Sequence, residues 1–157
     1  MKHTISVLVE NKPGVLARVA GLFSARGYNI ASLAVSETFD PEISHMTIVV
    51  QAEDEKILEQ IKKQLNKLID VITITDFTKK EHVERELILA KVDYSAKNKA
   101  KLENIVGKYV AKIVQRKADT AIIEIVGEQV QIKQVLEELG QFGIKELIRT
   151  GKIAMTY

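Results

Sequence analysis

The first thirty residues change their hydrophobic period once, and this change is the strongest constraint on the fold. Residues 4–9 alternate between polar and apolar side chains, which predicts a half-buried strand. From residue 16 to residue 23 the apolar side chains recur every three or four positions, which predicts an amphipathic helix. Gly27 follows where a glycine commonly ends a helix. The chain therefore opens with a strand, a turn and a helix.

The turn between these elements, residues 11–14, has the chemistry of a small anion site. Asn11 tolerates unusual backbone angles, Pro13 fixes φ, and Gly14 permits a positive φ. The free N–H groups of the helix N-terminus suit a carboxylate, and Gly14 has no side chain to keep a ligand away. The simpler interpretation is a tight turn that binds nothing, and the turn alone favours it.

Asn29 and the neighbouring apolar residues change this balance. Asn29 starts the next predicted strand, where capping a turn would also explain it. A turn alone leaves the carboxylate site, the amide side chains and the apolar Val15, Leu16 and Ile30 without a use. Together these features suit a small apolar amino acid.

The rest of the first half completes a known order of elements. Strands are predicted at residues 30–37, 44–52 and 71–77, and Asp54 can cap a helix that precedes the last of them. The order strand, helix, strand, strand, helix, strand is ferredoxin-like. We therefore expect an α+β fold.

The predicted sheet is apolar on one side only. A sheet with one polar face needs helices on one face only, and its edge strands stay open for pairing with a second copy. The predicted amino-acid site would then lie near a subunit boundary. The residues expected on the polar face are Thr4, Ser6, Ser32, Ser36, His45, Thr47, Thr73 and Thr75.

The second half repeats the order of elements after a charged break. We expect two ferredoxin-like βαββαβ domains in tandem, at residues 1–77 and 85–157, joined by a linker at 78–84. Ser95 is expected to cap the first helix of the second domain and Gly107 to end it. A last short strand is expected at residues 153–157.

Strands of the second half are apolar on both sides. Residues 87–90 and 122–126 show this pattern, and such a sheet must be covered on both faces. Helices supply one cover, and another copy, the first domain or a different protein must supply the other. We therefore predict that the second domain is an association module.

Composition excludes several classes of protein. With 46% hydrophobic and 28% charged residues the chain is globular, and no apolar run is long enough to span a membrane. A strand that begins close to Met1 leaves no room for a signal peptide. The lack of cysteine excludes disulfides, thiolate zinc sites and a cysteine nucleophile, and it is compatible with the cytoplasm, where we expect the protein.

Charge does not indicate nucleic-acid binding. Residues 1–78 hold 8 basic and 10 acidic side chains, whereas residues 79–157 hold 15 and 11. The lysines at 97, 99 and 101 cluster, but no aromatic residues alternate with them as base stacking requires. We interpret the cluster as a solvated helix face. The Ser/Thr-rich face of the first sheet also argues against an RNA-binding surface.

No catalytic or metal site is expected. His3, His45 and His82 are isolated, and no carboxylate lies at metal-ligand spacing from them. There is no phosphate-binding loop, dinucleotide fingerprint or nucleophile elbow.

Several long segments resemble one family, the small regulatory subunits of acetohydroxyacid synthase (acetolactate synthase). The resemblance is strong over the first ninety or so residues and extends beyond them by length and element order. The segments that carry it are SVLVEN at 6–11 with Gly14, RVAGLFSARGYNI at 18–30, SHMTI at 44–48, EQIKKQLNKL at 59–68 and HVEREL at 82–87.

This resemblance implies a fold, partners and a site. It implies an N-terminal ACT domain that dimerises with a second copy, and a C-terminal domain of related topology. The chain would bind and activate the catalytic large subunit and confer feedback inhibition by a branched-chain amino acid, with valine the first choice. Thiamine diphosphate, magnesium and FAD would belong to the catalytic subunit, with no cofactor in this chain. The residues that would line the effector site are Asn11, Gly14, Val15, Leu16, Asn29 and Ile30.

One departure and one alternative accompany the resemblance. Many ACT domains have Asp where this chain has Asn11, so less negative charge would face the ammonium group of an effector. The alternative is a stand-alone ACT-type amino-acid sensor that controls another enzyme or a transcription factor. Such a sensor would bind the amino acid without affecting an acetolactate-forming enzyme.

Overall fold

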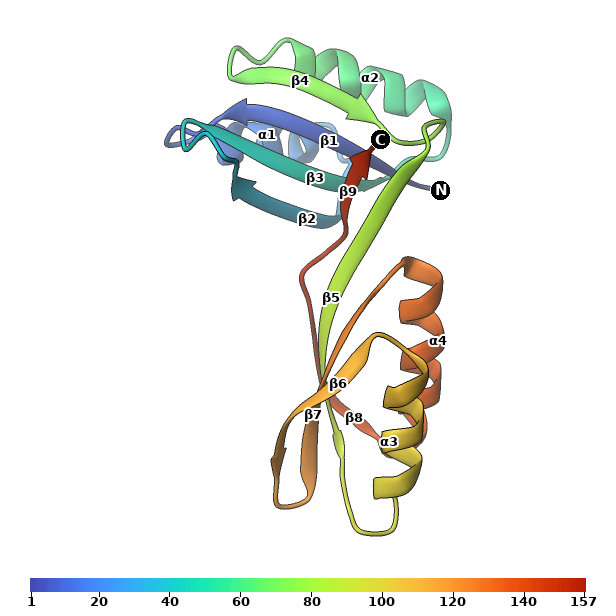
Figure 1. Cartoon of the computed structure of the whole chain (residues 1–157). Coiled ribbons are helices and arrows are strands. Elements are labelled where there is room, and N and C mark those ends of the chain that lie inside the picture. Colours follow the sequence, from blue (N-terminus) through green and yellow to red (C-terminus); the bar gives the residue numbers. More distant parts are fainter. The chain divides into compact units, whose positions relative to one another are not determined.

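The computed structural model describes residues 1–157, and the chain folds into two units (Figure 1). The first unit comprises residues 1–83 and 152–157, and the second comprises residues 84–151. The elements of the first half are β1 (Lys2–Glu10), α1 (Val15–Ala25), β2 (Asn29–Glu37), β3 (Ile43–Gln51), α2 (Glu55–Asn66) and β4 (Val71–Asp76). Those of the second half are β5 (His82–Asp93), α3 (Lys99–Lys108), β6 (Ala111–Lys117), β7 (Thr120–Gly127), α4 (Gln129–Leu139), the 3-10 turn η1 (Gly140–Phe142), β8 (Ile144–Arg149) and β9 (Ile153–Thr156).

The sheet of the first unit has the order β2-β3-β1-β4, and every neighbouring pair is antiparallel. Val7 at the centre of β1 pairs with Met46 of β3 on one side and with Ile74 of β4 on the other. This order, with one helix after β1 and one after β3, is the predicted ferredoxin-like arrangement, which is therefore confirmed.

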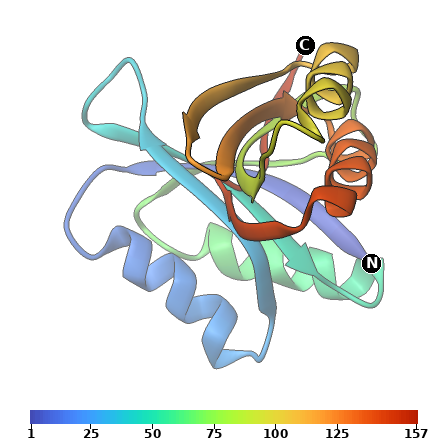
Figure 2. The ribbon, with the colours of Figure 1, turned by 90° about the horizontal axis from the view of Figure 1, so that it is seen from below.

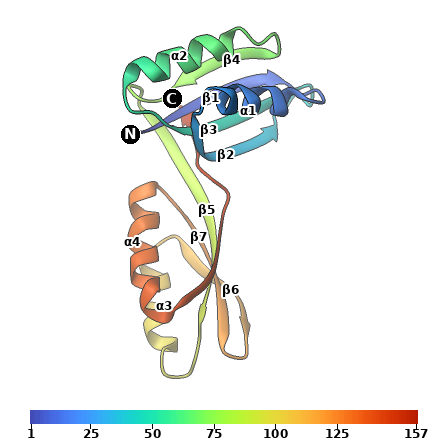
Figure 3. The same cartoon turned by 180° about the vertical axis from the view of Figure 1, so that it is seen from behind.

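Both helices of the first unit cover the same face of this sheet. Figures 2 and 3 show α1 and α2 side by side against the strands. Val19 and Phe23 of α1 and Leu65 of α2 are buried in one cluster with Ile5 and Ile48 of the sheet. The apolar period of each helix therefore produces the core.

The opposite face of the first sheet is polar, as the alternation predicted. Ser6 pairs with Thr47 of β3 and with Thr75 of β4, so a row of hydroxyl side chains crosses this face. The Ser6 Oγ and His45 Nε2 atoms lie 2.6 Å apart in a hydrogen bond on the same face.

The second unit repeats the topology with the order β6-β7-β5-β8. Its core joins Ile88 and Ile123 of the strands to Leu102 of α3 and Ile132 of α4. The opposite face is apolar only in part: Leu87 pairs with Val126 on the side away from Ile88, but on that side Leu89 pairs with Glu124 and Lys91 pairs with Glu146. Leu89, on that same side, is 36% exposed.

The region between the halves is a turn that leads directly into a long strand. Residues 78–84, for which the sequence predicted a linker, contain this turn and the first residues of β5. The terminal strand β9 pairs with β5, and its contacts group residues 152–157 with the first unit, although the sequence assigned them to the second domain.

Helix ends follow the predicted caps in the first unit and depart from them in the second. Asp54 caps α2 by accepting a hydrogen bond from the Ile57 N–H at 2.9 Å, and Gly27 follows α1 with φ of 68°, so both predictions are confirmed. Ser95 does not cap α3, which begins after Asn98, and Gly107 lies within that helix. The first prediction is wrong because the residues before α3 form their own turn, described below, and the second because Gly107 does not take a positive φ and the helix continues to Lys108.

None of the helices is both long enough and apolar enough to cross a membrane.

Candidate functional site

The turn between β1 and α1 leaves the N-terminus of α1 uncapped. Gly14 is the N-cap, with φ of 84° in the left-handed region that favours glycine, and no side chain caps the helix. Its carbonyl oxygen accepts the Arg18 N–H at 3.0 Å, which starts the helix. The Val15 N–H donates to the Lys12 carbonyl oxygen at 3.3 Å, which leaves the N–H groups of Leu16 and Ala17 in the first turn for an anion that the helix dipole favours.

Arg18 places a positive charge beside this helix end. A Cβ atom at Gly14 would lie 2.9 Å from Arg18 Nη1, so the guanidinium group is packed directly against the glycine. Arg18 Nε also donates to Asp70 Oδ2 at 2.8 Å, and the Asp70 side chain is only 10% exposed. Asp70 therefore holds the guanidinium in position at the entrance of α1.

Sequence reasoning missed Arg18. The available signal was its spacing, because residues 14 and 18 are one helical turn apart and lie on the same face. Its partner Asp70 lies 52 residues away along the chain, so the pattern around the turn could not reveal it.

Asn11 is tied to the hairpin between β2 and β3. Its side-chain Nδ2 donates to the Pro41 carbonyl oxygen at 2.8 Å, and its backbone N–H donates to the Glu42 carbonyl oxygen at 2.7 Å. The amide nitrogen is thus engaged, and Oδ1 is the atom that remains to accept from an ammonium group.

Val15 and Leu16 occupy different environments. Val15 is 3% exposed and belongs to the core, so its side chain packs inward. Leu16 is 45% exposed at the start of α1. Of these two predicted residues, Leu16 is the one whose side chain can contact a ligand at this surface.

Asn29 and Ile30 lie at the other end of the sheet. Asn29 pairs with Gln51, and Gln51 pairs with Lys2 at the beginning of β1, whereas Asn11 follows its end. A strand of nine residues separates the two ends, a distance of roughly 25–30 Å. One chain therefore brings Asn11, Gly14 and Leu16 together but leaves Asn29 and Ile30 apart from them.

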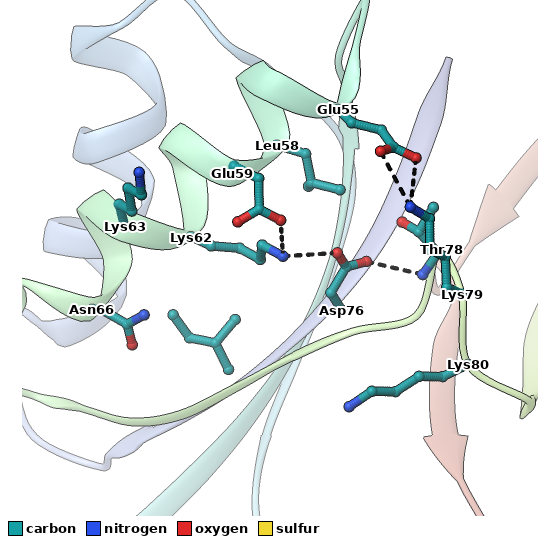
Figure 4. Close-up of a pocket in the computed structure, with 11 residues that line it drawn as sticks. Glu55, Leu58, Glu59, Lys62, Lys63, Asn66, Asp76, Thr78, Lys79 and Lys80 are labelled. Carbon is teal, nitrogen blue, oxygen red and sulfur yellow. Dashed lines mark hydrogen bonds and ion pairs between the residues drawn. The ribbon is translucent and has the colours of Figure 1, made fainter.

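A separate hollow of about 520 Å³ lies between α2 and β4 (Figure 4). Lys62 contacts Glu59 and also forms an ion pair with Asp76 at 3.1 Å. The hydrogen bond that Lys62 donates to Glu59, with a further contribution from Asp76, raises the Lys62 pKa. Burial acts to raise the Asp76 pKa, but hydrogen bonds from Thr78 and Lys62 outweigh burial and lower it. Because these charges neutralise one another, the hollow offers no unpaired group from this cluster to a ligand.

Comparison with known proteins gives the same family along the whole chain. A sequence profile described as an AHAS small subunit-like ACT domain matches residues 5–73. A second profile, described as the small subunit of acetolactate synthase, matches residues 85–157.

Individual relatives agree with these profiles. The chain is 49% identical over 155 residues to a probable acetolactate synthase small subunit of Archaeoglobus fulgidus, covering 99% of this chain and 96% of the relative. It is 46% identical to the acetolactate synthase small subunit of Aquifex aeolicus, covering 98% and 80%. The crystal structure of the Thermotoga maritima acetolactate synthase small subunit is 38% identical, covers 100% of this chain and 98% of that one, and has a TM-score of 0.89.

Proposed function

The chain belongs to the acetolactate synthase small subunit family, and from this premise we propose that it is a sensor of branched-chain amino acids that activates and inhibits the catalytic subunit. The observation that carries this proposal is the uncapped N-terminus of α1 with the Arg18 guanidinium beside Gly14. Membership of the family itself implies a regulatory role and a catalytic partner.

The effector carboxylate would bind at the entrance of α1. Helix N–H groups and a guanidinium group together favour a carboxylate more strongly than a helix end alone. Asn11 Oδ1 would accept a hydrogen bond from the effector ammonium group, because Asn11 Nδ2 is already bonded to Pro41. Leu16 is exposed beside this position and would contact the branched hydrocarbon.

Asn29 and Ile30 would come from a second copy. β2 is an edge strand with one free side, and antiparallel pairing of two β2 strands would continue the sheet across a two-fold axis. In that arrangement the Asn29 end of one β2 lies against the Glu37 end of the other. Glu37 pairs with Ser44, and Ser44 pairs with Val9 near the end of β1, close to Asn11. Dimerisation would therefore complete the predicted set of residues.

Valine is our first choice of effector. An additional methylene in an apolar pocket changes affinity by only about 1–3 kcal/mol, so leucine and isoleucine are expected to compete with valine for the same site. Inhibition then requires that the effector bind one arrangement of the complex more tightly than another.

Catalysis would take place in the catalytic subunit. We place thiamine diphosphate, magnesium and FAD there, and we assign no chemical step to a residue of this chain. A chain that controls a biosynthetic enzyme in this way would work in the cytoplasm.

The direct test is calorimetric titration with valine, leucine and isoleucine, with alanine as a control ligand. In the Gly14→Asp variant the new carboxylate would lie beside Arg18, where the effector carboxylate binds. We expect at least a hundredfold loss of valine affinity, while activation of the catalytic subunit is largely kept. Gly14→Ala is the matched control, because it carries the same backbone strain at φ of 84° without the carboxylate, and Gly21→Asp adds the same charge to α1 where a new Cβ meets no neighbouring atom within 4 Å.

Two outcomes would contradict the proposal. If Gly14→Asp binds valine with native affinity, the site is assigned wrongly. If the chain binds valine but leaves the activity of the catalytic subunit unchanged, the chain is a sensor for another target.

A further inference from the structure

The tip of the hairpin between β2 and β3 presents a fully exposed aromatic side chain. Phe39 is the most exposed large apolar residue of the chain and belongs to neither core. A lone exposed apolar residue is common on protein surfaces and by itself indicates no partner. The shape, charge and position of this tip do indicate one, because each matches the same segment of a second copy.

Hydrogen bonds within the hairpin hold the tip, residues 38–42, in one shape. The Thr38 N–H donates to the Ile43 carbonyl oxygen at 2.8 Å, and the Ile43 N–H donates to the Asp40 carbonyl oxygen at 3.0 Å. The Asp40 side chain accepts the Glu42 N–H at 2.9 Å. Because the tip is already ordered, little conformational entropy of its backbone is lost when a partner binds it.

The pairing of two β2 strands fixes which part of a second copy lies beside the tip. Full overlap of the two antiparallel strands places Leu33 of both copies at the two-fold axis. Residues equally far from Leu33 on either side then lie opposite one another, so the register continued past the strand ends brings Phe39 opposite Gly27 of the second copy. The tip of one copy therefore lies beside residues 26–28 of the other.

Residues 26–28 offer a place for the Phe39 ring. Gly27 has φ of 68°, and a Cβ atom there would meet no other atom within 4 Å, so the backbone at this residue is open to a partner. Arg26 on one side is exposed, and the half-buried Tyr28 on the other side packs against the core. A ring seated on Gly27 contacts a guanidinium group and a second aromatic ring, and both contacts are favourable.

The charges of the two segments are opposite. Residues 37–42 hold three acidic side chains and no basic one. Within its own chain Arg26 donates to the uncharged amide of Gln64 at 2.8 Å, and the Asp40 carboxylate accepts a backbone N–H. Both charges are therefore available for an ion pair between copies, which favours this pairing of segments over others.

The same contact would join the two halves of the candidate effector site. Within one copy, the tip accepts the two hydrogen bonds of Asn11 at Pro41 and Glu42, and Figure 2 shows it at the same end of the first unit as the turn before α1. In the second copy, residues 26–28 lead directly into Asn29 at the start of β2. The distance between Asn11 of one copy and Asn29 of the other is therefore set where the tip meets residues 26–28.

We propose that the hairpin tip of each copy binds residues 26–28 of a second copy, with the Phe39 ring on Gly27 and Asp40 paired with Arg26. Two such contacts, one at each end of the paired β2 strands, close the two effector sites of the dimer. The proposal rests on the two-fold dimer of the function proposed above, and it adds the residues that hold the two halves of each effector site together.

The first test uses chemical cross-linking, because the chain has no cysteine of its own. Phe39→Cys and Arg26→Cys are introduced together, and the protein is treated with a short bis-maleimide reagent. Within one chain the nine residues of β2 separate these positions by roughly 25–30 Å, so only two copies can be joined. We expect a covalent dimer in the double variant and none in either single variant, because identical residues of the two copies lie at opposite ends of the strand pair. The same yield of covalent dimer in all three proteins would overturn the proposal.

The second test compares Phe39→Ala with Ile69→Ala in the full chain. Ile69 is also almost fully exposed, but it precedes β4 at the other edge of the first sheet. Sedimentation over a range of concentrations measures the dissociation constant of the dimer. We expect Phe39→Ala to raise this constant about tenfold and Ile69→Ala to leave it within about twofold. Valine affinity should stay within about twofold where the protein is fully dimeric, and in Phe39→Ala it should fall on dilution because each site needs both copies.

A double-mutant cycle tests the ion pair. Arg26→Met and Asp40→Asn should each weaken the dimer by about two- to tenfold, and Asp40→Asn should have little further effect in the Arg26→Met chain. Asparagine keeps the side-chain oxygen that accepts the Glu42 N–H, so the turn is preserved. Fully additive effects would show that the two charges do not meet. Because Arg26 holds the dimer and does not touch the effector, fully dimeric Arg26→Met should bind valine with unaltered affinity.

The remaining outcomes separate this proposal from the function on which it rests. A dimer that binds valine, gives no covalent product in the double cysteine variant and is unaffected by Phe39→Ala would overturn this contact alone. A chain that stays monomeric at every concentration would overturn both the contact and the two-fold effector site. A dimer that is weakened by Phe39→Ala but binds no branched-chain amino acid would support the contact and contradict the proposed function.

Discussion

The two units have the same topology, yet the turns that follow their first strands differ. In the first unit Gly14 leaves α1 uncapped, with Arg18 beside it. In the second unit Asn98 precedes α3, and its side chain closes the turn by accepting the Ser95 N–H at 2.7 Å and donating to the Asp93 carbonyl oxygen at 3.1 Å. In the second unit the side chain of Asn98 therefore fills the turn that precedes the helix.

The fourth residues of the two helices differ as well. Arg18 is the fourth residue of α1, whereas the fourth residue of α3 is Leu102, which is fully buried in the core. The same helical position thus carries a charged side chain at the surface in one unit and a core side chain in the other. The shared topology provides the same turn twice, and only the turn with Gly14 and Arg18 is a candidate site.

The open faces of the two sheets also differ. Ser6, Thr47 and Thr75 form a polar row in the first unit, whereas Leu87 and Val126 pair in the second. Ser6 and Thr47 are nevertheless buried, whereas Leu87 and Leu89 are each 36% exposed, and exposed apolar side chains favour contact with protein. The first unit is therefore the better candidate for the sensor and the second for association.

The largest effects are expected from changing the fourth residue of α3, which should alter stability, and the fourth residue of α1, which should alter effector affinity. Leu102→Ala should lower the free energy of unfolding by about 2–5 kcal/mol and leave effector affinity unchanged, because it opens a cavity in the second core. Arg18→Met should weaken valine binding by roughly 10- to 100-fold, because a charge-assisted hydrogen bond is lost. Urea unfolding measures the change in stability, and calorimetry measures the change in valine affinity.

Arg26→Met is the control for the arginine variant. Arg26 lies just after the same helix and bonds to Gln64 at 2.8 Å, away from Gly14. Equal losses of valine affinity in Arg18→Met and Arg26→Met would show that the guanidinium beside Gly14 has no special role.

An intermediate effect is expected on association. Leu89→Asp introduces a charge opposite Glu124 on the open face of the second sheet, where we expect another protein surface to bind. The variant should sediment as a smaller species or bind the catalytic subunit less tightly, whereas Thr73→Asp on the polar face of the first sheet should do neither. A compact monomer at micromolar concentration, with normal affinity for the catalytic subunit, would contradict the role of this face in association.

The smallest effect concerns pH and the polar face of the first sheet. Burial lowers the pKa of His45 below its ordinary value of 6.5. The unfolded chain therefore binds the proton more readily, so stability should be complete above about pH 6.5 and should fall as the pH drops below that value. Urea midpoints measured from about pH 7 to pH 5 should decrease, and the decrease should be weaker in His45→Asn. The same decrease in both chains would assign the effect to other groups.

Local patterns in the sequence were sufficient to predict the element order and the turn. The alternation before residue 10, the glycine at 14 and the helical period after it each depend on neighbours within a few residues. The repeat of this order in the second half, and the contrast between a polar and a partly apolar open face, could be predicted for the same reason. The caps of α3 could not, because Asn98 competes with Ser95 for the same turn and only the folded geometry selects between them.

Which of the predicted site residues lie together depends on contacts between residues that are distant in the sequence. The predicted set combined both ends of β1, and only the register of β1, β2 and β3 separates Asn29 from Asn11. Only the packing of α1 turns Val15 into the core and leaves Leu16 exposed.

The local sequence was enough to predict a carboxylate site at the start of α1, because the backbone conformation at a glycine and the start of a helix are local properties. The surroundings of that predicted site depend on tertiary contacts: Asp70 holds Arg18 from 52 residues away, and the hairpin between β2 and β3 is bonded to Asn11. These partners meet only when the strands pair, and a pairing between distant segments is set by the packing of the whole unit rather than by the residues beside each partner.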